Sequence, residues 1–92
     1  AERAARRFEE LGCHVEEAHP NLGDPWPIVD TIWSAGMAAA EVDDLATTRE
    51  LLDPGRLAVI EAGLAISAVD LAKAYLARSR YYEGWRAFML RY

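Results

Sequence analysis

Lysine and cysteine are nearly absent from this sequence, which has Lys73 and Cys13 as its single examples among 92 residues. A lone cysteine cannot form an internal disulfide and fits a reducing compartment, so we expect a cytoplasmic protein. No apolar run approaches the ~20 residues of a membrane helix and no signal peptide is visible, so we expect no membrane partner. The net charge is −5 and there is no basic stripe, which argues against a nucleic-acid partner.

Apolar residues, by contrast, are abundant. They make up 52% of the chain, which includes three tryptophans and four tyrosines. The length predicts a single domain over residues 1–92. A chain this short buries only about 60–65% of its unfolded surface, so apolar surface should remain exposed, and such surface usually marks an interface. We therefore expect a homo-oligomer, most simply a dimer, or a contact with a missing part of a larger enzyme.

Apolar residues recur every three to four positions over most of the chain, which predicts helices. Asp24 and Asp53 each precede a proline, a pattern typical of a helix start. Ser67 has an acidic residue three positions later, which resembles a capping box, and Gly12 stands where a helix end favours a left-handed residue. The predicted helices cover about residues 1–11, 26–45, 54–66 and 68–92, with residues 43–52 left ambiguous.

One segment breaks the helical pattern. Side chains from Cys13 to Ala18 alternate with a period of two, which predicts a short strand over residues 13–17 with one apolar side. A single strand cannot satisfy its own backbone groups, so its partner must come from elsewhere. The predicted fold class is therefore mainly α with one short β-strand, an α+β arrangement whose strand pairs with another chain.

Two segments of the chain carry a family resemblance. The first runs from Phe8 to Pro20 (Phe-Glu-Glu-Leu-Gly-Cys-His-Val-Glu-Glu-Ala-His-Pro), and the second runs from Leu52 to Gly63 and is followed by Ser67-Ala68-Val69-Asp70. In this order they resemble the later part of an amidase signature family enzyme. The resemblance implies that residues 1–92 are a C-terminal-half segment of an amidase domain. It also implies a helix–strand–helices fragment of an amidase-type α/β/α fold.

Enzymes of that family hydrolyse amide bonds with a serine nucleophile, a bridging serine in a cis peptide and a lysine base. The Gly/Ser-rich segment that carries these groups lies earlier in the family's chain and is missing from this sequence. Lys73 is six residues from both Ser67 and Ser79, about 240° around a helix, so neither serine points toward it. We therefore predict no catalytic residue here, and a fragment of an amide hydrolase that is not an amidase by itself.

Residues 13–19 hold the densest set of metal-ligand side chains in the chain. On a strand, His14 and Glu16 would share a face with Cβ atoms ~7 Å apart, close enough to ligate one divalent metal ion. His19 could fold back as a third ligand. Such an ion lowers the pKa of bound water toward about 7, which would make a small self-assembled, metal-assisted hydrolase. The spacing matches no established metal motif, and a solvent-facing strand edge accounts for the same residues. No other cofactor is implied.

A third alternative is a helical protein–protein interaction module that binds its partner through the long C-terminal helix. The aromatic residues of that helix could line a ligand pocket, but at helical spacing they are more typical of a core or an interface. The sequence leaves three interpretations open: an amidase fragment, a metal-assisted hydrolase and an interaction module.

Overall fold

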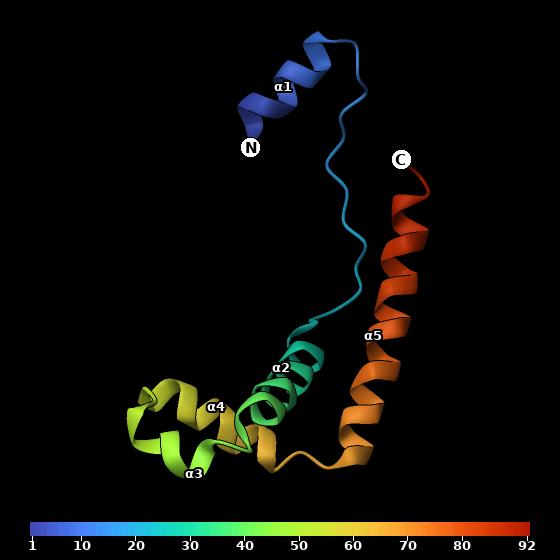
Figure 1. The fold of residues 1–92 in the computed structure, drawn as a ribbon. Coiled ribbons are helices and arrows are strands. Elements are labelled where there is room, and N and C mark those ends of the chain that lie inside the picture. The colour runs from blue at the N-terminus through green and yellow to red at the C-terminus, as the bar shows by residue number, and fades with distance from the viewer.

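The computed structural model describes all 92 residues, and it is entirely helical (Figure 1). Helix α1 stands apart from the remaining helices, to which it is joined by an extended segment that we call the arm (residues 12–25). The helices after the arm form one group. In chain order the elements are α1 (Glu2–Glu10), α2 (Trp26–Glu41), α3 (Leu45–Thr48), the 3-10 helix η1 (Arg49–Leu51), α4 (Pro54–Leu64) and α5 (Ala68–Met89).

The predicted strand over residues 13–17 is wrong, and so is the α+β class that depended on it. These residues are extended but belong to no strand or sheet. No backbone–backbone hydrogen bond is made by any residue from His14 to Asp24. Alternating side chains favour an extended backbone, but a strand also requires a second strand to accept and donate its hydrogen bonds. The chain supplies none, so the fold is all-α.

Two of the three predicted helix starts are confirmed by their capping bonds. At the third, Asp24 lies one residue before the N-cap of α2, which is Pro25 and forms no side-chain cap. The Asp53 carboxylate accepts hydrogen bonds from the backbone N–H groups of Gly55 and Arg56, at 2.7 and 3.0 Å. Ser67 Oγ accepts from the Asp70 N–H at 3.1 Å and donates to Asp70 Oδ2 at 2.6 Å. Each cap satisfies backbone donors that have no partner within the helix. These bonds explain why α4 and α5 begin where they do.

Helix α1 ends at the glycine predicted to stop it. Gly12 has a φ of 89°, in the left-handed region. Its N–H donates to the carbonyl of Glu9 at 2.9 Å, and the N–H of Cys13 donates to the carbonyl of Phe8 at 3.0 Å. This pair of bonds is the Schellman arrangement, which closes a helix and turns the chain out of it. The arm therefore leaves α1 in a fixed direction.

The core lies where α2 meets α4 and α5, and it is small. Ile60 of α4 is the only large side chain that is fully buried, and Ala38 of α2 and Ala74 of α5 are its main apolar companions in the interior. Gly63 of α4 lies directly against the backbone of Ser34 in α2, because a Cβ built on the glycine would come within 2.0 Å of the Ser34 carbonyl oxygen. The absence of a side chain at this position allows the two helices to approach so closely.

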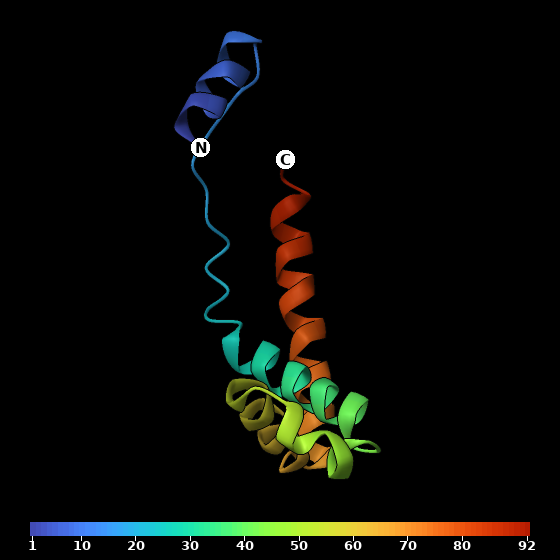
Figure 2. The same ribbon diagram turned by 60° about the vertical axis from the view of Figure 1, so that its left-hand side comes forward.

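The molecule is elongated. Its radius of gyration is 19.6 Å, whereas a compact chain of this length has a radius of gyration of about 12 Å. Both ribbon views place α1 beyond the C-terminal end of α5, with α2 and α4 at the opposite end (Figures 1 and 2). The arm runs along α5, and Leu22 packs against Gly84 of that helix. The helices after the arm thus form the body of the molecule, and α1 is carried away from it.

Candidate interaction surface

The chain exposes more surface than its size requires. The accessible area is 7517 Å², whereas a compact monomer of 10.2 kDa exposes about 5,300 Å². The excess is about 2,200 Å². Two chains that buried this excess together would form an interface of about 4,400 Å², within the range of obligate dimers and permanent complexes. The elongated shape and the separate helix α1 contribute to this excess.

Many large apolar side chains are part of the exposed surface. Every long helix exposes large hydrophobic side chains. Of all the large hydrophobic side chains in the chain, only Ile60 is fully buried. Trp33 of α2 is 62% exposed, and Leu76 of α5 is 59% exposed. Helices that keep such side chains in water are normally covered by another element or another protein.

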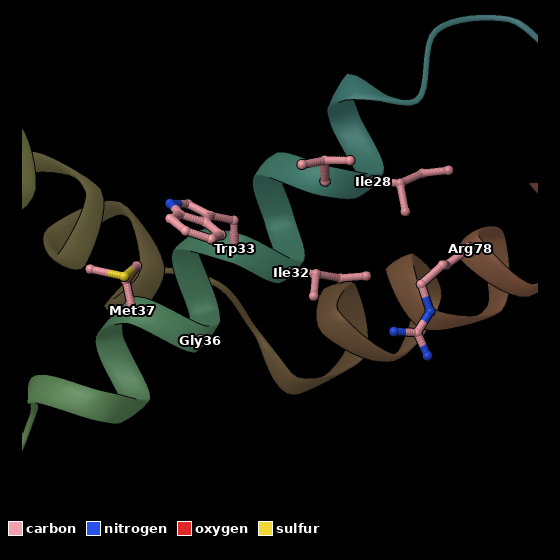
Figure 3. Close-up of a pocket in the computed structure, with 7 residues that line it drawn as sticks. Ile28, Ile32, Trp33, Gly36, Met37 and Arg78 are labelled. Atoms are coloured by element: carbon pink, nitrogen blue, oxygen red, sulfur yellow. The ribbon is translucent and has the colours of Figure 1, made fainter.

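One concavity of the molecule is an apolar groove along α2. It has a volume of about 390 Å³, and its walls carry almost no polar surface. Figure 3 shows that its lining comes mainly from α2, with one residue of α5 at its side. We call this site the α2 groove. Its lining residues are Ile28, Val29, Ile32, Trp33, Gly36, Met37 and Arg78.

Arg78 gives the α2 groove its single charge. Its guanidinium carbon lies 5.0 Å from the ring centroid of Tyr75, a cation–π arrangement that holds the side chain over the surface of α5. Arg78 belongs to none of the ion pairs of the chain. The groove therefore combines an apolar floor with a positive charge that has no acidic partner.

The C-terminal half of α5 continues the exposed apolar surface. Trp85 packs edge-on against Phe88 at 5.8 Å between ring centroids, and Phe88 lies 5.2 Å from Tyr92. Tyr82 and Met89 on the same part of the helix are 63% and 59% exposed. This aromatic cluster is preorganised but incompletely covered, which is typical of interface anchors.

The serines and the lysine occupy separate structural positions. Ser34 is buried against Gly63, and Ser67 caps α5. Ser79 donates to the carbonyl of Tyr75, and Lys73 lies 3.7 Å from Asp70. No hydrogen bond joins the lysine to a serine. The chain therefore holds no serine–lysine pair of the kind that cleaves amides in the family it resembles.

The three candidate metal ligands are only partly brought together. His14 Nε2 lies 3.8 Å from Glu16 Oε2, so these two side chains do share one side of the arm. His19 instead places Nδ1 beside Asn21, where it also accepts from the Asn21 N–H at 3.1 Å. No group of three His, Cys, Asp or Glu side chains is placed to share an ion. The third ligand that a divalent site requires is thus missing from this arrangement.

Glu16 makes a different contact, with the end of α5. A hydrogen bond from the Tyr92 hydroxyl is the largest influence on the Glu16 carboxylate and lowers its pKa, and the charges of His14 and Arg91 lower it further. The same hydrogen bond raises the pKa of the Tyr92 hydroxyl. The arm therefore approaches α5 at two points, where Leu22 packs against Gly84 and where Glu16 lies near Tyr92.

Two features of the site were not found from the sequence. The first is Gly63, which sets the α2–α4 contact although no local pattern marks it. Arg78 was not singled out as a binding residue. Its position at an apolar groove depends on the crossing of α2 and α5, which no local pattern encodes.

Comparison of the chain with protein-family models, with curated proteins and with solved structures finds no match in any of the three. None of the helices combines the length and the apolar character that crossing a membrane requires.

Proposed function

We propose that this chain is a non-catalytic association segment, a helical protein–protein interaction module, of an amidase signature hydrolase. Amide-bond hydrolysis would belong to the full-length enzyme and not to these residues. The excess of about 2,200 Å² of accessible surface carries the proposal. The exposed large hydrophobic side chains form part of this surface. A partner that covered them would stabilise the chain, because burying apolar area contributes about 25 cal/mol per Å².

The family part of the proposal is supported by residues and not by the fold. Two segments carry it, from Phe8 to Pro20 and from Leu52 to Asp70. In their order and spacing they resemble the later part of an amidase signature enzyme. The serines and Lys73 are engaged in packing, capping and local polar contacts, which fits a segment without catalytic groups. The absence of a third ligand near His14 and Glu16 gives the metal-assisted alternative no comparable support.

The isolated chain should self-associate through its exposed apolar helices at micromolar concentration. Sedimentation velocity over a dilution series measures this directly. Leu76→Glu places a charge on the exposed face of α5 and should weaken association at least about tenfold, because a buried unpaired charge costs more than one hydrophobic anchor. Leu51→Glu is the matched control, because Leu51 is 84% exposed on η1, away from α5.

A chain that sediments as a monomer at all micromolar concentrations would contradict the proposal. So would equal weakening by Leu51→Glu and Leu76→Glu, because it would show that general charge, and not the apolar helix surface, controls association. Circular dichroism of both variants verifies that their helices are intact.

A further inference from the structure

We propose that the α2 groove binds helix α1 of a second copy of this chain, so that two chains exchange their N-terminal helices. This inference rests on the proposed association function and names the segment that carries it. The groove is an apolar site without an occupant in its own chain, and α1 is an amphipathic helix whose apolar face is not covered by its own chain. Three observations join the two.

The first observation is that α1 has nothing to pack on. It contains no buried residue. Phe8 and Leu11 are 55% and 65% exposed, and together with Ala1, Ala4 and Ala5 they form one apolar face at helical spacing. A nine-residue helix is too short to be stable alone in water. An amphipathic helix of this kind is stabilised when its apolar face is buried in a groove.

The second observation is that the dimensions agree. Helix α1 has nine residues and is about 14 Å long at about 1.5 Å per residue. The groove follows α2 from Ile28 to Met37, which is also about 14 Å along the helix axis.

The third observation decides between the chain's own α1 and that of another copy. The arm lies along α5, where the Leu22 side chain packs against Gly84 and the Glu16 carboxylate lies near the Tyr92 hydroxyl. These contacts carry α1 past the C-terminal end of α5, whereas the α2 groove is at the other end of the molecule (Figures 1 and 2). Helix α1 cannot reach its own groove while the arm stays in place. A second chain in the opposite orientation meets no such obstacle, and the two-fold exchange fills both grooves.

Cross-linking between two distinguishable chains tests this pairing. One chain carries Ala5→Cys and an affinity tag, the other carries Gly36→Cys, and both carry Cys13→Ser so that no other thiol is present. A short bis-maleimide should join tagged to untagged chains. A control pair with Arg6→Cys, on the opposite side of α1, and Gly36→Cys should cross-link at most weakly.

Truncation of the α1 face gives an independent readout. Phe8→Ala should raise the dissociation constant of the dimer about 100-fold, because each of the two exchanged helices loses an anchor worth about tenfold. Arg6→Ala should leave the constant unchanged. The Phe8 side chain is not part of the core, so the body of the molecule remains folded.

The outcomes separate this inference from the proposed function. Association that is unaffected by Phe8→Ala, with no cross-link between different chains, overturns the helix exchange and leaves the association function standing. A third chain carries both Ala5→Cys and Gly36→Cys; a cross-link that forms only within this chain, and not between the two singly substituted chains, assigns the groove to the chain's own α1 and also overturns the exchange. A chain that is monomeric throughout contradicts both proposals.

Discussion

Replacing Gly63 with alanine should destabilise the protein, although alanine is the better helix former. A Cβ at position 63 would lie 2.0 Å from the carbonyl oxygen and 2.5 Å from the carbonyl carbon of Ser34, and 2.8 Å from the Cβ of Ala38. Two of these neighbours are backbone atoms that cannot rotate away. Normal contact requires about 3.4 Å or more between carbon atoms, so α4 must move about 1 Å away from α2.

The free energy of this displacement can be estimated from the core that it opens. Ile60 is fully buried at the same helix contact, and overpacking of a well-packed core costs about 1–3 kcal/mol. The gain in helix propensity from Gly to Ala offsets about 1 kcal/mol of this. We therefore expect a net loss of up to about 2 kcal/mol in the free energy of unfolding.

Gly36→Ala is the matched control. Gly36 also lies inside a helix, but no atom is within 4 Å of a Cβ built there. The propensity gain of about 1 kcal/mol should then appear without a steric cost, and the variant should be more stable than the parent. Urea unfolding followed by circular dichroism, with all three proteins at one concentration, measures both changes. Equal stabilisation by the two substitutions would refute the reasoning about the α2–α4 contact.

Three further predictions concern the arm, a cap and catalysis. The pKa of Glu16 is lowered from 4.5, so its contact with Tyr92 contributes fully above pH 4.5 and is lost as the pH falls through the lowered value. The pKa of Tyr92 is raised from 10.0, so the contact is also complete below pH 10.0 and is lost as the pH rises through the raised value. A nitroxide on Cys13 should broaden the amide signals at the end of α5 only between these limits, and Glu16→Gln should remove the acid transition. Ser67→Ala should cost about 1 kcal/mol in unfolding free energy because α5 loses its N-cap; Ser79→Ala, which removes only a bond to the preceding turn, should be nearly neutral in the same urea experiment. The isolated chain should release no more chromophore from an anilide substrate than buffer does, and cleavage that disappears in Ser67→Ala would contradict the non-catalytic proposal.

The sequence predicted those features that depend on a few neighbouring residues. Asp53, Ser67 and Gly12 act within one helical turn of their own positions, and the structure confirms each of them. The strand at residues 13–17 required a second segment to pair with, and alternation in one segment carries no information about whether that second segment exists. The contact of Gly63 with Ser34 could not be predicted from the sequence for the same reason, because it depends on how two helices cross.

The placement of apolar residues on α5 supports the proposal that the chain associates with a partner. Ala74 faces the α2 contact and is buried. Leu76 lies about 160° around the helix from Ala74, and Val69, seven residues earlier, shares its side. Both are about 60% exposed. A helix that served only this body would carry polar residues on that side, because an amphipathic helix covers its core with one apolar stripe. A helix that packs between two partners requires apolar side chains on two opposite sides, and α5 has them. This chain provides only one of the two packing partners.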